Sequence, residues 1–210
     1  MDLADFALFF VTALAIAVSP GPGIFYVAAR TLAGGRDEGL ASSVGTGVGG
    51  LVHVTAGAVG VSALVMASAE AFAILKIAGA AYLVWVGIKT LREARIDLDV
   101  RVNATGAPRA FREGIIVEAL NPKTAVFFLA FLPQFVDPAD GPVWLQFLLL
   151  GLVSVILNTA VDVVVAVVAS RARSMAVARP SVLRRLRQGA GLAIASLGLA
   201  LVFARRPASL

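Results

Sequence analysis

Residues 115–135 read IIVEALNPKTAVFFLAFLPQF, an apolar stretch interrupted by the polar triplet Asn121-Pro122-Lys123. Proline removes a backbone hydrogen-bond donor and clashes with the preceding helical turn, so a helix that enters this stretch must kink or stop near Pro122. We therefore expect a membrane-spanning helix over about residues 111–136 that is broken at the triplet. The rest of the chain is best understood in relation to this break.

A second break of the same kind lies in the first apolar stretch, at Ser19-Pro20-Gly21-Pro22-Gly23. A shift of 102 positions places Ser19 on Asn121 and Pro20 on Pro122. Broken helices at corresponding positions of two repeats point to the binding site of a secondary transporter, because half-helix ends and freed backbone groups there can hold polar cargo. The two segments are thus predicted to form one site.

The composition is that of a polytopic membrane protein. Of 210 residues, 59% are hydrophobic and 15% are charged, and the mean hydropathy is +0.90, far above an ordinary soluble domain. Without cysteine, the chain has neither disulfides nor thiol catalysis, and with one histidine it has no multi-histidine metal site. We therefore expect no metal and no cofactor. The net charge of +5 comes from basic residues beside apolar stretches, so the positive-inside rule explains it and no nucleic-acid partner is expected.

The hydropathy pattern predicts an all-α membrane protein with six transmembrane helices, since a span needs about 20 mostly apolar residues. The expected spans are about 3–29, 40–66, 72–91, 111–136, 143–170 and 186–204. Six spans divide into two sets of three, and an odd number per repeat gives the repeats inverted topology, with helices 1 and 4 broken. The chain would be one transporter domain over 1–210, with repeat 1 at about 1–91, a cytoplasmic linker at about 92–111 and repeat 2 at about 112–206.

Two local features complete this prediction. Arg36-Asp37-Glu38 is expected to form a short charged turn after the first span. The second span is rich in glycine, and the spacing of Gly45 and Gly49 suits close helix contact. Packing is the favoured role for these glycines over ligand binding. The small-residue faces of spans two and six also leave open a homodimer contact.

The distribution of basic residues sets the orientation. Arginine and lysine gather in the loops between spans one and two, three and four, and five and six, which are therefore predicted to be cytoplasmic. The first residues lack the basic region of a secretory signal, so the first segment is expected to be kept as a span. The prediction is a multi-pass protein of the bacterial inner membrane with both termini periplasmic or external.

Four ionisable side chains fall inside the expected spans: His53, Glu118, Lys123 and Asp162. Each is costly in hydrocarbon, so each is a functional hypothesis that requires a partner. Lys123 directly follows the break, where its ammonium could meet a substrate carboxylate or an internal acid. For His53, the only side chain that titrates near neutrality without perturbation, a hydrogen bond to a backbone carbonyl is favoured over a transport role.

We expect different roles for the two acids, Asp162 and Glu118. Asp162 shares a helix face with Asn158 and Ser154, at a spacing of four residues, and this polar stripe suits the wall of a wet cavity. Asp162 is interpreted as a group that exchanges protons during a transport cycle, with a structural pairing to Lys123 or an arginine as the alternative. For Glu118, proton coupling and a local hydrogen bond are equally weighted.

The helix breaks supply backbone groups as well. A helix that restarts after Gly21-Pro22-Gly23 or after Pro122 directs unpaired N–H groups and a positive dipole end toward the protein interior. An amino-acid carboxylate would be stabilised there. Two packing kinks are the alternative explanation.

Several segments together resemble the LysE/RhtB family of bacterial amino-acid exporters. They are Ser19-Pro20-Gly21-Pro22, Gly39 to Gly49 with His53, Lys76-Ile77-Ala78-Gly79-Ala80-Ala81-Tyr82-Leu83 with Gly87, and Asn121-Pro122-Lys123 with Phe127-Phe128 and Pro133-Gln134-Phe135. The resemblance covers nearly the whole chain. It implies export of amino acids or close derivatives from the cytoplasm, driven by the proton motive force, with alternating access to the two sides of the membrane.

Carried over by position, the resemblance places the substrate and proton pathway at Ser19 to Gly23 and at Asn121 to Lys123. The partners would be an amino-acid substrate, protons and the lipid bilayer, and family members differ in cargo between cationic and neutral amino acids. An inorganic cation transporter on the same fold is the alternative. A membrane-embedded enzyme is more distant, because no nucleophile and base are nominated.

Overall fold

The computed structural model describes residues 1–68, 70, 71, 73, 74, 77 and 104–171, and this part of the chain is helical without strands. The helices are α1 (Leu3–Val18), α2 (Pro22–Gly34), α3 (Arg36–Ala67), α5 (Ala107–Ala119), α6 (Pro122–Val126) and α7 (Val143–Arg171). A π-helical turn (Phe127–Phe131) and a 3₁₀ turn (Leu132–Phe135) extend α6, and a 3₁₀ turn (Pro138–Asp140) precedes α7. The sixth expected span, 186–204, and almost all of the third, 72–91, lie outside the described residues.

Both predicted helix breaks are present. The first helix ends at Ser19, whose extended backbone (ψ 122°) is the conformation favoured before a proline, and α2 restarts with Pro22 in its first turn. The second break follows the same plan, with Asn121 extended (ψ 111°) and Pro122 opening α6. The two halves meet at 48° in the first pair and at 43° in the second.

Two unbroken helices are long and apolar enough to cross a membrane, and the number of spans rises to four if each bent pair counts as one. One is Arg36–Ala63 within α3, and the other is α7, whose mean hydropathy reaches 2.4. These helices agree closely with the second and fifth expected spans. If each bent pair is one span, the described residues account for four of the six expected spans.

The boundaries correct two expectations. The charged turn predicted at Arg36-Asp37-Glu38 is wrong, because these residues form the first turn of α3. Acidic side chains are stabilised at the positive end of a helix, and Gly35 alone, with φ of 82°, is enough to join α2 to α3. In addition, α5 begins at Ala107, so the last residues of the expected linker are helical.

Glycines allow α3 to pack directly on the backbone of α5. A Cβ on Gly49 would lie 2.5 Å from the carbonyl oxygen of Ile115, and one on Gly45 would collide with the carbonyl of Phe111. From the other helix, a Cβ on Gly114 would lie 2.8 Å from the carbonyl oxygen of Ser42. The packing role expected for Gly45 and Gly49 is therefore confirmed, and the close contact places α3 against α5, the helix that leads into the second break.

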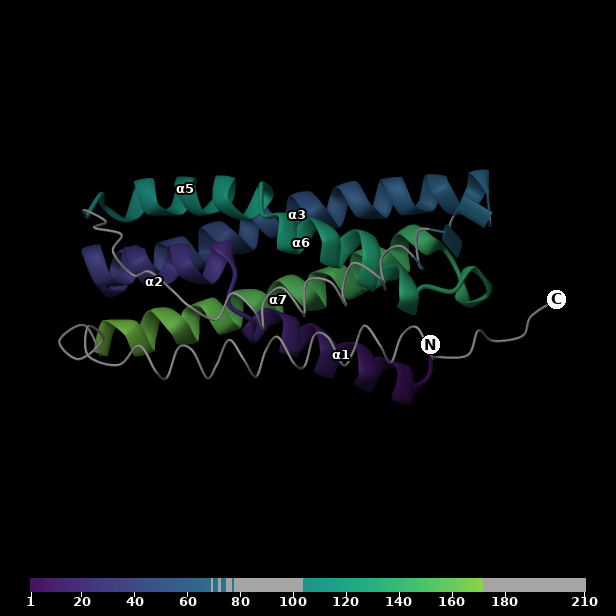
Figure 1. The fold of residues 1–210 in the computed structure, drawn as a ribbon, viewed down its shortest axis with the longest axis horizontal. Coiled ribbons are helices and arrows are strands. Elements are labelled where there is room, and N and C mark those ends of the chain that lie inside the picture. The colour runs from purple at the N-terminus through teal and green to yellow at the C-terminus, as the bar shows by residue number, and fades with distance from the viewer. Residues whose placement is uncertain (69, 72, 75–76, 78–103, 172–210) are drawn as a thin grey trace.

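The two bent pairs run in opposite directions (Figure 1). Near one end of the molecule, the ring of Phe9 in α1 lies 5.4 Å from that of Phe135 beyond α6. Toward the other end, Tyr26 of α2 donates a 2.8 Å hydrogen bond to the carbonyl of Ala110 in α5. The N-terminal half of one pair thus packs beside the C-terminal half of the other, and the two breaks meet between these contacts. An aromatic core with Phe127, Phe128, Phe131 and Phe147 holds the α1 and α6 end together.

Candidate functional site

A hydrogen bond joins the two helix breaks. The Lys123 ammonium donates to the backbone carbonyl of Ser19 at 2.5 Å. Room for this side chain depends on Gly21, because a Cβ there would lie 2.8 Å from Lys123 Cδ. The carbonyl of Ser19 is available because the helix is interrupted after Val18, so this carbonyl lacks the i+4 backbone partner that a continuous helix would give it. The predicted meeting of the breaks is therefore present in the structure.

Asn121 ties the second break to the nearby acid. Its side-chain oxygen accepts from the backbone N–H of Lys123 at 3.0 Å, which caps the first turn of α6. Its side-chain amide donates to Glu118 Oε2 at 2.8 Å. Pro122 itself is exposed and contributes its fixed backbone geometry.

Glu118 lies at the centre of the site although only 2% of its surface is exposed. Its second carboxylate oxygen, Oε1, accepts from the Thr124 hydroxyl at 2.6 Å. A Cβ on Gly23 would lie 2.6 Å from Oε2, so this acid contacts the first break as well as the second. The local hydrogen bonds expected for Glu118 are present, and both of its carboxylate oxygens are satisfied.

His53 supports the site from outside the cavity. Its Nε2 lies 2.9 Å from the backbone carbonyl of Glu118, and since a carbonyl can only accept, Nε2 carries the proton and donates. The imidazole ring also stacks on Phe128 at 6.0 Å. The favoured interpretation of this histidine, a hydrogen bond to a backbone carbonyl, is confirmed.

The polar stripe of α7 divides between the cavity and the protein interior. Ser154 and Asn158 line the cavity, whereas Asp162 is fully buried behind it and contacts the hydroxyl of Thr46 at 2.7 Å. Among the described residues, no ion pair joins Lys123 to either Glu118 or Asp162. The structure therefore does not contain the direct pairing of Asp162 with Lys123 that was the alternative prediction.

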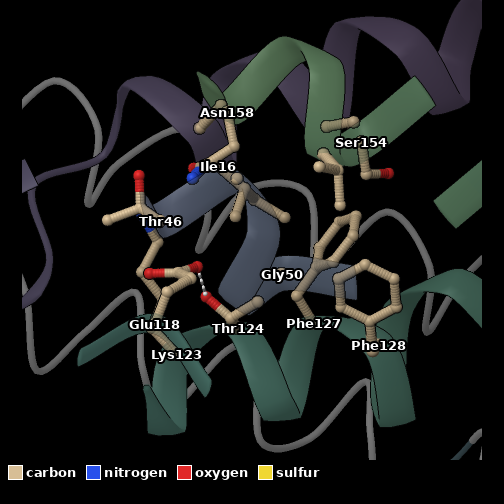
Figure 2. Close-up of a pocket in the computed structure, with 14 residues that line it drawn as sticks. Ile16, Thr46, Gly50, Glu118, Lys123, Thr124, Phe127, Phe128, Ser154 and Asn158 are labelled. Carbon is tan, nitrogen blue, oxygen red and sulfur yellow. Dashed lines mark hydrogen bonds between the residues drawn. The ribbon is translucent and has the colours of Figure 1, made fainter. Parts of the chain in front are cut away.

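The cavity lies between the two breaks, α3 and α7. Figure 2 shows the rings of Phe127 and Phe128 on one side, with Thr46, Glu118 and Asn158 on the other. The polar lining residues are Thr46, Glu118, Lys123, Thr124, Ser154 and Asn158, and the remaining lining residues are Ala13, Ile16, Ala17, Gly47, Gly50, Phe127, Phe128 and Val155. The volume open to water is about 30 Å³, room for roughly one or two water molecules. In this conformation the cavity is too small for an amino acid.

Sequence reasoning missed three polar contributors. Thr46 and Thr124 both line the cavity, and both bind an intramembrane acid. Thr124 directly follows the break and could have been found from that position. Thr46 lies among glycines that were interpreted only as packing residues. The third contributor is the backbone carbonyl of Ser19, which a sequence cannot identify as a ligand.

A second polar cluster joins α2 to α5 outside the cavity. Arg30, with 10% of its side chain exposed, forms an ion pair with Glu113, and the Tyr26 hydroxyl lies 3.2 Å from the same carboxylate. Arg109 binds the other oxygen of Glu113 at 2.7 Å. The described residues hold no group of three or more side chains that could bind a metal ion.

Comparison with known proteins gives a consistent result. The family described as LysE type translocator matches residues 14–205. A homoserine/homoserine lactone efflux protein of Salmonella typhimurium is 32% identical over 198 residues, which cover 94% of this chain and 95% of the relative. An uncharacterized membrane protein of Vibrio cholerae is 33% identical over 77% of this chain and 78% of its own length.

A more distant relative, a leucine efflux protein of Klebsiella pneumoniae, is 27% identical over 63% of this chain and 64% of its own length. No solved structure shows a significant match. The family match extends over both breaks and over every residue of the cavity except Ala13.

Proposed function

The chain belongs to the family of LysE type translocators, and we propose that it exports amino acids or amino-acid derivatives across the bacterial inner membrane in exchange for protons. The observation that carries the proposal is the contact of the two helix breaks at a cavity lined by Lys123. An ammonium at this depth is costly unless it has a partner, and among the described residues it has no carboxylate within ion-pair distance. A substrate carboxylate would fill that role.

The apolar side of the cavity fits the rest of such a substrate. Phe127, Phe128 and Ile16 form a surface on which an aliphatic side chain would pack, while Ser154 and Asn158 offer hydrogen bonds to an amino or hydroxyl group. The printed names of two relatives, a homoserine/homoserine lactone efflux protein and a leucine efflux protein, support amino acids as the cargo class.

The opposite course of the two bent pairs supports inverted repeats. We propose six spans in two sets of three, with the third and sixth spans supplied by residues outside the described part of the chain. The loops rich in arginine would be cytoplasmic, and both termini would be external, as the positive-inside rule predicts.

Alternating access is supported by the small volume of the cavity. About 30 Å³ holds water and not an amino acid, so loading requires the half-helices to move apart on one side. The Arg30–Glu113 ion pair holds α2 against α5 at one end of the two bent pairs. Opening toward the cytoplasm would break this contact.

Transport in proteoliposomes tests the proposal. Vesicles loaded with radiolabelled homoserine or leucine, and placed in a medium more acidic than their lumen, should release the label faster than protein-free vesicles. Replacing Lys123 by Ala should abolish this release, whereas replacing the exposed Arg112 by Ala should not. Release that depends on an inorganic cation gradient, with no response to amino acids, would support the alternative of a cation transporter.

A further inference from the structure

The hydroxyl of Thr46 has two neighbours that can accept a hydrogen bond but only one proton to give. Its oxygen lies 2.7 Å from Asp162 Oδ2 and 2.8 Å from the backbone carbonyl of Ser43. A carbonyl cannot donate. If Thr46 donates to Ser43, the proton in the 2.7 Å contact must therefore come from Asp162.

The surroundings of Asp162 decide between the two arrangements. The residue is fully buried, and in the described part of the chain its other oxygen, Oδ1, has no hydrogen-bond partner. An ionised Asp162 would be a buried carboxylate that accepts one hydrogen bond, at Oδ2, and none at Oδ1, which is a costly state. With a proton on Oδ2, Asp162 donates to Thr46, Thr46 donates to Ser43, and no charge is buried.

Glu118, in the same site, has the hydrogen-bond donors that a carboxylate needs and that Asp162 lacks. Both of its oxygens accept, from the amide of Asn121 and from the hydroxyl of Thr124. The orientation of the Asn121 amide is fixed because its oxygen already accepts from the backbone N–H of Lys123. Glu118 is therefore suited to remain a carboxylate beside the Lys123 ammonium.

We infer that Asp162 is a protonated carboxylic acid in this conformation and is the group that carries the proton of the exchange, while Glu118 stays ionised. The role in exchange rests on the proposed function, whereas the protonation state does not. Thr46 lines the cavity and connects Asp162 to it. When water enters the cavity, the proton on Oδ2 passes to Thr46 Oγ1, the hydroxyl proton of Thr46 passes to that water, and a carboxylate remains at Asp162.

The charged side chains that act on Asp162 are few. Among the described residues they are Glu118 from α5 and Lys123 from α6. α3 contributes the neutral Thr46 at this level, and the two titratable side chains of α2, Tyr26 and Arg30, are bound to Glu113. Between its first turn and its end, α1 has no titratable side chain.

Infrared spectroscopy tests the protonation state without any substrate. A protonated carboxyl has a C=O stretching band that is separate from that of a carboxylate. Near neutral pH, purified wild-type protein in nanodiscs should show such a band that is missing after Asp162→Asn and retained after Glu118→Gln. The Asn side chain can still donate to Thr46, so the variant should fold. An unchanged band in Asp162→Asn, or its loss in Glu118→Gln, would overturn the assignment.

Proton-driven export tests the role in exchange. With homoserine or leucine as the probe, Asp162→Asn should release label no faster than empty vesicles, while Asp37→Asn, an exposed acid on α3, should match the wild type. Export by Asp162→Asn with the wild-type dependence on pH would refute the proton-carrying role. If wild-type protein moves neither probe but the infrared band is present, the proposed function fails and the protonation state stands.

Discussion

The Lys123 ammonium lies 2.5 Å from the carbonyl oxygen of Ser19, a residue 104 positions earlier in the chain. One contact thus links the end of α1 to the beginning of α6. The helix interruption at Pro20 leaves the Ser19 carbonyl without an intrahelical partner, and Pro122 opens α6 just before Lys123, so both prolines act through the backbone.

Replacing Asn121 by Leu should impair both stability and export. The substitution removes the cap of α6 and leaves Glu118 Oε2 without its donor, and a buried acceptor without a partner costs about 1–3 kcal/mol. Thermal unfolding in detergent and homoserine or leucine release report the two effects. Thr55→Val, which alters an exposed hydroxyl bonded within α3, is the control. A variant with the wild-type Tm and export rate would show that Asn121 is not required.

Replacing Gly23 by Ala should abolish export although alanine favours a helix more than glycine does. The new methyl would lie 2.6 Å from Glu118 Oε2, so the acid or the start of α2 must shift. Gly60→Ala is a matched control, because nothing lies within 4 Å of a Cβ there and both glycines are helical. Equal export rates for the two alanine variants would contradict the close approach of the first break to Glu118.

Replacing Gly114 by Ala should destabilise the fold as a whole. Its Cβ would meet the backbone of α3, 2.8 Å from the Ser42 carbonyl oxygen, and backbone cannot rotate away as a side chain can. Overpacking of this kind costs about 1–3 kcal/mol. The Tm in detergent should fall relative to Gly60→Ala, and an unchanged Tm would mean that α3 and α5 are farther apart than the structure has them.

Replacing Glu113 by Gln should loosen the end where α2 meets α5. The substitution removes the charge that binds Arg30 and Arg109. Since the chain has no cysteine, Ala17→Cys in the cavity wall gives a single labelling site. Maleimide labelling at this site should be faster in the Glu113→Gln background. Equal labelling rates in both backgrounds would show that the Arg30–Glu113 ion pair does not restrict access to the cavity.

Labelling from outside the cell tests the orientation. A membrane-impermeant maleimide should modify Asp140→Cys in intact cells and should modify Arg112→Cys only after the cells are opened. Both positions are exposed, so access to one side of the membrane decides the result. The reverse pattern would place the arginine-rich loops outside and overturn the predicted topology.

Much of the described fold could be predicted from the sequence, because the strongest signals in the sequence are local. Pro20 and Pro122 interrupt helices through their own backbone chemistry, and long apolar stretches predict α3 and α7 whatever surrounds them. The same locality explains the error at Arg36-Asp37-Glu38, where charges that look like a loop instead stabilise the start of a helix.

By itself, the sequence determined that this chain is helical, that two of its helices are broken, and that four ionisable side chains lie in its apolar stretches. Only the tertiary structure decided which of these groups share a site and which partners each of them has. Glu118 and Asp162 look alike in a sequence, yet one accepts two hydrogen bonds while the other depends on Thr46 of a different helix. The reason is physical: the free energy of a buried charge depends on donors brought to it by packing, and those donors lie far away along the chain.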